Sequence, residues 1–400
     1  MTQAQLDKDR DGASTSETDY QADKDSYSLV YDYNMKDNLK FNLLSSYYNS
    51  VSESSTSTSI TNFDESKIAF KPKLNYEYSK GTLTAGYDYT FNNIVRDTKL
   101  GNGAFYDISK MTNSVFLNNR YNMNKLELIT GYRYEKSDYE MKDQKYGTKT
   151  PSDMDKTSSN SAYSMGLNYL YSDSGKLYGK FESGYTFPDP RQYINLTNGE
   201  GELNNLQDEE FMTYEIGFQD YIINSLVKGA VYYTEKENEI RKEGSSLNAK
   251  FYNIDASKRI GGELSISQNI KKLELSESIA YIDAKVTEGT YEGKRIPYVS
   301  KITSSINATY TFNEKVDLSA NITYRDKYYV DASNLSGLVN DKFVTDIKVN
   351  YSIDSNWKTY AGINNLFNAD YYNTINYSSG AYTYDPASER NYFIGFNYSF

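Results

Sequence analysis

Apolar and polar residues alternate along almost the whole chain, and this pattern restricts what the chain can fold into. From Ile68 to Tyr78 every second residue is apolar, aromatic or Pro, and the residues between them are mostly Lys, Asn and Glu. The same period of two returns between Val316 and Tyr324 and again between Tyr392 and Phe400. Successive side chains of a β-strand point to opposite faces, so a strand between an apolar and a polar environment shows this pattern. The chain is therefore expected to be all-β.

About seventeen segments carry this alternation, and each is expected to form one strand. The expected ranges are 26–33, 38–49, 65–79, 82–92, 111–121, 125–136, 159–171, 176–186, 210–221, 225–241, 249–268, 272–286, 298–312, 315–325, 342–353, 356–364 and 389–400.

The connections between these segments are short and long in strict alternation. Short ones such as 79–81 are typical of tight hairpin turns, whereas long ones such as 137–158 and 187–209 are rich in Ser, Asn, Asp, Gly and Thr. Bacterial outer-membrane barrels have short periplasmic turns and longer extracellular loops. A soluble β-sandwich would not enforce this order of connections, and a solenoid or propeller would show a fixed repeat length. The pattern predicts a transmembrane antiparallel β-barrel with its tight turns in the periplasm.

The composition agrees with a barrel and argues against other classes of protein. The 400 residues include 43 Tyr, whose apolar ring and polar hydroxyl suit the aromatic girdles at the membrane surfaces. Without His or Cys, a Ser-His-Asp triad, a thiol nucleophile and a His-ligated metal are absent, so most hydrolase and redox mechanisms are not expected. A net charge of −11 offers no basic field for nucleic acid.

The start of the chain is expected to lie outside the membrane. A short turn follows 26–33, so this strand is expected to run from the outside to the periplasm, and residues 1–25 are then a truncated extracellular loop. Residues 26–400 are expected to be the C-terminal part of a barrel that has an odd number of further strands upstream. The first and last strands run in the same direction, so we expect that this chain alone does not close into a sealed barrel.

The C-terminal segment resembles the signature of TonB-dependent outer-membrane receptors. The residues that carry the resemblance are Leu366, Phe367, Asn368, Tyr371, Arg390 and Phe400. Segments 184–218, 253–267 and 293–312 resemble barrel segments of the same family in order and spacing, so the resemblance covers about residues 26–400. It implies a barrel of roughly twenty-two strands, of which this chain holds the last seventeen, and an N-terminal plug that is missing here.

The resemblance also implies a function. A member of this family is a non-enzymatic receptor and active transporter of the Gram-negative outer membrane. It takes up a scarce ligand, usually a ferric siderophore, and the TonB complex drives uptake through the plug. A cobalamin receptor of the same family and a passive porin or structural barrel remain open as alternatives. The last strand, with Phe396, Tyr398 and Phe400, also resembles the signal that the barrel-assembly machinery reads. No cofactor is expected, and the expected partners are membrane lipid, TonB, this machinery and an iron chelate.

Two segments contain candidate binding residues. Arg191, Gln192 and Tyr193 lie in a long connection and could face an anionic ferric chelate, although a solvated loop explains them better. The run Asp7, Asp9 and Asp11 followed by Gly12 matches the first half of a calcium loop. The acidic residue that completes this pattern is missing, because position 18 is Thr. An acidic tail explains the run better, and no metal is expected.

The last group of candidates consists of charges expected on the lumen face. A charged side chain near the middle of the bilayer costs about 2–4 kcal/mol, so charges within the strands mark the face that turns away from lipid. We expect them to pair with one another or with the plug. They are Lys71, Glu77, Arg133, Lys180, Glu182 and Glu215.

Overall fold

The computed structural model describes residues 18–56, 58–99, 104–145, 152–197, 200–243, 249–335, 337–378 and 381–399. Within these ranges the chain forms one antiparallel sheet of seventeen strands, which confirms the expected all-β class and strand number. The strands are β1 (Asp19–Lys36), β2 (Leu39–Ser55), β3 (Ile60–Tyr78), β4 (Gly81–Lys99), β5 (Ala104–Met123), β6 (Leu126–Lys145), β7 (Ser152–Leu170), β8 (Lys176–Thr186), β11 (Glu209–Ile222), β12 (Ser225–Glu243), β13 (Lys250–Ile270), β14 (Leu273–Glu288), β15 (Ile302–Asn313), β16 (Val316–Arg325), β19 (Lys342–Ser352), β20 (Trp357–Asn364) and β23 (Asn391–Tyr398).

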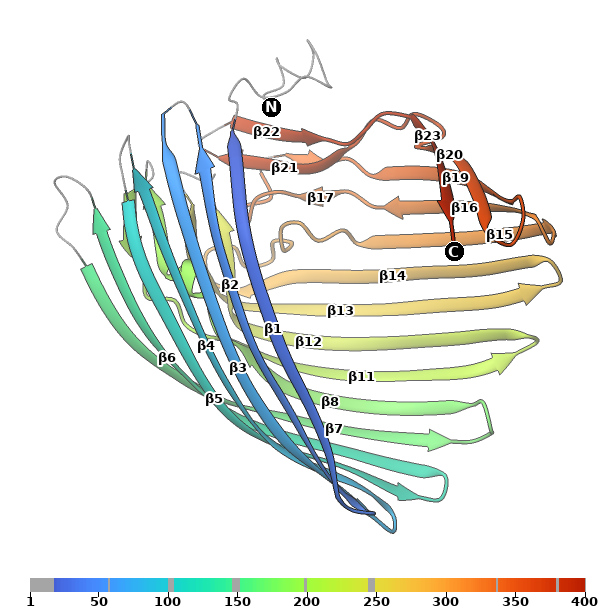
Figure 1. Cartoon of the computed structure of the whole chain (residues 1–400), viewed down its shortest axis with the longest axis horizontal. Coiled ribbons are helices and arrows are strands. Elements are labelled where there is room, and N and C mark those ends of the chain that lie inside the picture. Colours follow the sequence, from blue (N-terminus) through green and yellow to red (C-terminus); the bar gives the residue numbers. More distant parts are fainter. Residues whose placement is uncertain are drawn as a thin grey trace.

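The sheet is strongly curved, so that β1 to β6 lie at a steep angle to β11 to β16 (Figure 1). Each strand pairs with the next sheet strand in sequence. Among the described residues, β1 pairs only with β2 and β23 pairs only with β20. The sheet therefore has two unpaired edges in this structure.

The two faces of the sheet differ as the alternation predicts. On the convex face of β3, Ile68, Phe70 and Leu74 are exposed. On the other face of the same strand, Lys71 and Lys73 line a cavity. One face of the sheet is thus suited to lipid and the other to a polar interior. In the part of the chain that the structure describes, no helix has the length and apolar character needed to cross a bilayer.

The strands are longer than expected at the ends that carry the long connections. β5 begins at Ala104 rather than 111, β6 ends at Lys145 rather than 136, and β7 begins at Ser152 rather than 159. Beyond the bilayer both faces of a strand meet water, so the alternation disappears although the backbone pairing continues. β1 likewise begins at Asp19, so residues 19–25 of the expected loop 1–25 belong to a strand. Residues 1–17 lie outside the described part.

Tight turns close the opposite ends of the strands. Between β11 and β12 the turn consists of Ile223 and Asn224, with φ of 47° and 62°. Two successive residues in the left-handed region make the type I′ turn, whose twist matches that of the flanking strands. Ile223 is 92% exposed, so its apolar side chain does not compensate this strained backbone by packing.

Three of the long connections contain small structures of their own. The connection from β8 to β11 contains the 3-10 helix η1 (Pro190–Tyr193) and a hairpin of β9 (Ile194–Thr197) and β10 (Glu200–Leu203). The later ones contain the hairpin of β17 (Tyr328–Tyr329) with β18 (Leu338–Val339), and that of β21 (Tyr372–Ser378) with β22 (Ala381–Pro386). These two later hairpins pack on each other through Tyr328, Val339 and Ile375.

Candidate functional site

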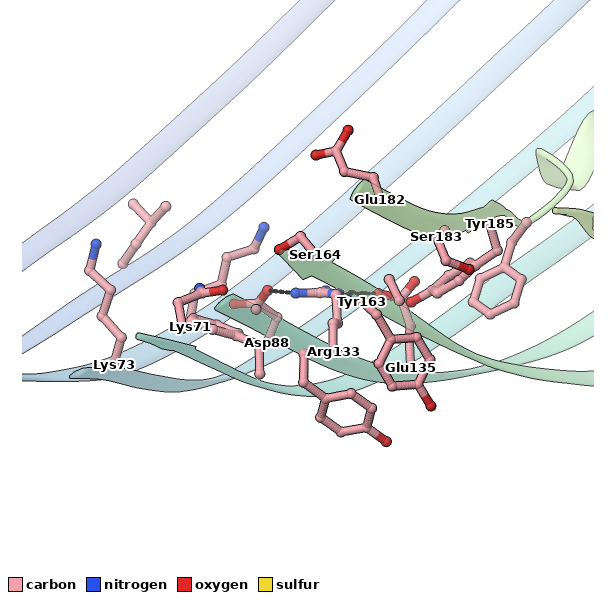
Figure 2. Close-up of a pocket in the computed structure, with 18 of the residues that line it drawn as sticks. Lys71, Lys73, Asp88, Arg133, Glu135, Tyr163, Ser164, Glu182, Ser183 and Tyr185 are labelled. Atoms are coloured by element: carbon pink, nitrogen blue, oxygen red, sulfur yellow. Dashed lines mark hydrogen bonds and ion pairs between the residues drawn. The ribbon is translucent and has the colours of Figure 1, made fainter. Parts of the chain in front are cut away.

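The concave face of the sheet carries paired charges and encloses the candidate site. Lys71, Arg133 and Glu182 line a cavity of about 1130 Å³ together with Asp88 and Glu135 (Figure 2). Lys180 also faces this side and lies 2.8 Å from Glu182, while Tyr178 donates a 2.8 Å hydrogen bond to Glu215. Glu77 lies four residues after Lys73 on β3, and this even spacing places it on the same face. The expected lumen charges therefore share one face, and several of them are paired.

Arg133 on β6 is the centre of the most complete network on this face. Its guanidinium lies 2.8 Å from Asp88 on β4 and 2.7 Å from Glu135, and it also donates to Ser114 on β5. Two of these contacts are drawn as dashed lines in Figure 2. The cation is therefore neutralised within the wall by carboxylates of β4 and of β6 itself, and hydrogen bonds between charged groups are the strong ones.

The connection from β8 to β11 folds inward over this part of the wall. Asp189 caps η1, because Arg191 N donates to its carboxylate at 3.0 Å and its own N–H donates to Gln192 Oε1 at 2.7 Å. Asn204 Nδ2 then donates to Gln192 O at 2.7 Å, which ties the end of the hairpin back to η1. This reciprocal capping satisfies polar groups that a short helix leaves unpaired.

An aromatic contact holds the folded connection against the wall. Tyr193 is fully buried, and its ring meets the edge of the Tyr139 ring from β6 at 5.2 Å between centroids. Lys156 Nζ lies 4.9 Å from the centre of the Tyr193 ring and Lys110 Nζ lies 5.1 Å from that of Tyr139. Tyr139 also donates a 3.1 Å hydrogen bond to Pro188 O. The connection is thus docked on β5, β6 and β7 by a small apolar core and two cation–π contacts.

A half-buried carboxylate lies at the end of the docked connection. The Oδ1 atom of Asp208 is shielded from water and, among the described residues, has no hydrogen-bond partner. Burial raises the pKa of Asp208, and the nearby Lys156 and a hydrogen bond with Ser158 oppose this shift. Burial also raises the pKa of Tyr193, so its hydroxyl stays protonated.

The three candidate ligand residues receive different positions. The Arg191 side chain is 48% exposed, with its guanidinium 5.0 Å from the Phe63 ring and 3.8 Å from Glu65. Gln192 instead caps η1, and Tyr193 is enclosed in the apolar core. Ligand contact through Arg191 stays a prediction, whereas Gln192 and Tyr193 serve capping and packing in this arrangement.

The C-terminal signature forms a turn after β20. Asn368 Oδ1 accepts a 2.8 Å hydrogen bond from Arg390 N, and so joins two parts of the signature that are distant in sequence. Leu366 N donates to Thr345 O at 2.7 Å, which fastens the turn to β19. The Phe367 side chain is 68% exposed. Tyr371 lies beside Lys342, whose Nζ is 5.0 Å from the centre of its ring.

Several candidates fall outside the described residues. Phe400 and the three acidic residues Asp7, Asp9 and Asp11 are among them. Within the described ranges, no group of three or more acidic side chains is placed to hold a metal ion.

Sequence reasoning missed one pair of residues on the concave face. Arg325 ends β16 and Lys342 begins β19, and the two are direct partners in the pairing of these strands. Both were visible as charged residues at the ends of expected strands, but only the register brings them together.

Comparison with known proteins identifies the family. Residues 2–366 match the family described as "TonB dependent receptor-like, beta-barrel". The chain belongs to this family. It is therefore a protein of the Gram-negative outer membrane, in a family of transporters rather than enzymes, and the expected fold and family are confirmed.

The similar proteins agree on the fold. The chain is 22% identical over 249 residues to the catecholate siderophore receptor Fiu of Escherichia coli, which covers 59% of this chain and 32% of that protein. It thus spans about a third of the length of the curated relatives it matches. The ferric yersiniabactin uptake receptor FyuA from Yersinia pestis superposes with a TM-score of 0.82 at 14% identity, covering 97% of this chain and 63% of that one. The copper transporter OprC gives a TM-score of 0.78 at 13% identity, covering 95% and 66%.

Proposed function

We propose that the chain is the barrel of a receptor that takes up a ferric siderophore across the outer membrane, driven by the TonB complex. The observation that carries the proposal is the membership in the TonB-dependent receptor family together with the sequence similarity to a catecholate siderophore receptor. TonB acts through a plug domain, the tight turns face the periplasm, and the last strand guides assembly of the barrel in membrane lipid.

The chemistry of the concave face supports an iron chelate rather than a bare soft metal ion. Copper ions are bound in proteins chiefly by Cys, Met and His, and this chain has no Cys, no His and only eight Met. Ferric catecholates are anionic and aromatic, and the long-connection end of the lumen offers cations that lie on aromatic rings. Arg191 over Phe63 is one such pair. Recognition of the organic part of a chelate therefore fits these residues.

The experiment is uptake of radioactive iron by iron-starved cells. Wild-type cells, cells lacking the gene for this chain and cells lacking TonB are supplied with a ferric catecholate labelled with ⁵⁵Fe, and with labelled cobalamin and copper in parallel. We expect the catecholate signal to fall in both mutants while cobalamin and copper uptake are unchanged. Loss of cobalamin or copper uptake instead would overturn the choice of ligand. Uptake of small solutes that depends on this gene but not on TonB would favour a passive pore.

A further inference from the structure

Two positive charges face each other across β16 and β19. Arg325 and Lys342 are paired residues in this part of the sheet. Their neighbours Tyr324 and Phe343 are also paired and point to the opposite face, where Phe343 is 51% exposed. Arg325 and Lys342 therefore both point toward the lumen, at the end of the strands that carries the long connections. Like charges directly opposite each other in a sheet are destabilising, so the pair needs an explanation.

The nearby carboxylates do not neutralise this pair. Asp326 and Asp341 are the next residues along the chain, and neither forms an ion pair with Arg325 or Lys342 within the described ranges. Arg325 is the charged group that acts on Lys342, and no carboxylate among the described residues forms an ion pair with either cation. The Nε and Nη2 atoms of Arg325 are shielded from water and have no hydrogen-bond partner in the described ranges.

Tyrosine rings surround the two cations. The Arg325 guanidinium lies 4.6 Å from the centre of the buried Tyr328 ring, and Lys342 Nζ lies 5.0 Å from that of Tyr371. The centre of the Tyr298 ring lies 5.9 Å from that of the Tyr328 ring, and Tyr298 is 48% exposed. Its φ of 60° is unusual for a bulky residue, and such strained positions gather at ligand sites. Its N–H donates to Tyr329 O at 2.8 Å, which holds the strained residue in place.

We propose that Arg325 and Lys342 form an anion subsite that binds the catecholate oxygens of the incoming ferric chelate. The inference rests on the proposed function and deepens it. The two cations supply N–H donors and positive charge to a ligand with closely spaced anionic oxygens, and Tyr298 offers a half-exposed ring beside Tyr328. Binding the anion balances the positive charge of Arg325 and Lys342 and removes the repulsion between the two cations.

The test separates binding from transport in whole cells that carry the full receptor. Cells are chilled so that no energised uptake occurs, and the affinity for a ⁵⁵Fe-labelled ferric catecholate is measured. Arg325→Met and Lys342→Met are each expected to weaken binding about tenfold, and Lys342→Arg is expected to restore it because the charge returns. The matched control is Lys348→Met, since Lys348 lies on the same strand and face with its Nζ 4.4 Å from the Tyr360 ring centre. This control should bind as the wild type does.

The possible outcomes distinguish the subsite from the receptor function. If the wild type binds and the Arg325 and Lys342 variants bind equally well, the subsite is wrong and the proposed function stands. If the wild type binds no ferric catecholate, the proposed function fails. A neutral ferric hydroxamate and a surface-protease assay accompany each variant. The protease assay shows that each variant reaches the surface folded. The subsite is supported when such a variant binds the anionic ferric catecholate more weakly but keeps its affinity for the neutral hydroxamate. An equal loss of affinity for both chelates contradicts the subsite.

Discussion

Positive charge is neutralised in one part of the lumen wall, formed by β4 to β6, and, in the portion of the chain that the structure describes, left without an ion pair in another, formed by β16 and β19. On β4 to β6, Arg133 is enclosed by Asp88 and Glu135 and is neutralised within the wall. On β16 and β19, Arg325 faces Lys342 and is left with two unpartnered nitrogen atoms among the described residues. A charge that the wall already balances contributes to the fold, whereas a charge that only an incoming anion can balance points to binding.

The long connections above these two parts differ in the same way. The connection from β8 to β11 docks on the first part through the buried Tyr193, and so covers it. Near the second part, the hairpins β17–β18 and β21–β22 pack on each other, and Tyr298 keeps a half-exposed ring beside Tyr328. The first part is therefore closed by its own chain, and the second keeps polar and aromatic groups available for a ligand.

The largest effect is expected where the connection docks. Replacing Tyr193 by Ala removes a fully buried ring and its contacts with Tyr139 and Lys156. Large-to-small changes of buried aromatic residues cost about 3–5 kcal/mol. We expect the connection to undock and to become sensitive to added protease on intact cells. Tyr298→Ala is the control, because its ring is half exposed. Equal protease sensitivity in both variants would show that Tyr193 is not what holds the connection.

The next effect compares the two arginines directly. Arg133→Leu leaves Asp88 and Glu135 without their partner and should lower the free energy of unfolding by about 2 kcal/mol, less than for a fully buried pair because the Arg133 side chain is 33% exposed. Arg325→Leu should change stability less, since it loses the contact with the Tyr328 ring but also removes the repulsion from Lys342. Urea unfolding of the purified receptor checks both values. An equal loss in the two variants would remove the distinction between the two parts of the wall.

The sequence predicted the first part of this comparison and not the second. Alternation predicted all seventeen strands and placed Arg133 and Glu182 on the lumen face, because that period survives wherever one face meets lipid. The alternation did not predict the strand ends beyond the bilayer, because both faces of a strand meet water there. β6, for example, continues to Lys145. The pairing of Arg325 with Lys342 depends on register across a connection of sixteen residues, which no local pattern determines. Likewise, nothing in the local sequence separates the exposed Arg191 from the buried Tyr193 two residues later.

A charge reversal should make the second part resemble the first. Lys342→Glu places a carboxylate directly opposite Arg325, and an opposite-charge pair across strands contributes about 0.2–1 kcal/mol. We therefore expect a small gain in stability together with a loss of ferric catecholate binding. Urea unfolding and binding by chilled cells measure the two quantities. A variant that is more stable and still binds would show that Arg325 and Lys342 do not receive the ligand.

The smallest effect concerns the pH dependence of the docked connection. Because burial is the largest influence on Asp208 and raises its pKa, the docked form binds a proton more readily than the undocked form. Docking should therefore strengthen as the pH falls through the raised pKa, until the ordinary value of 3.8 is passed and both forms are protonated. The charged and polar groups that act on Asp208 are Lys110, Lys156, Ser158 and Glu210.

Asp208→Asn removes this titration and tests its origin. The amide carries no charge to desolvate, so the variant should dock more firmly than the wild type at neutral pH and show a flatter pH profile. Lys110 and Lys156 attract the wild-type carboxylate, and losing this attraction makes the gain small. Hydrogen exchange of the backbone between β8 and β11, at neutral and mildly acidic pH, measures how firmly the connection is docked. If the variant keeps the full pH profile, the titrating group lies elsewhere. The docked connection would then owe its stability to Tyr193 and its apolar core alone, and the difference between the two parts of the wall would rest on Arg133 and Arg325.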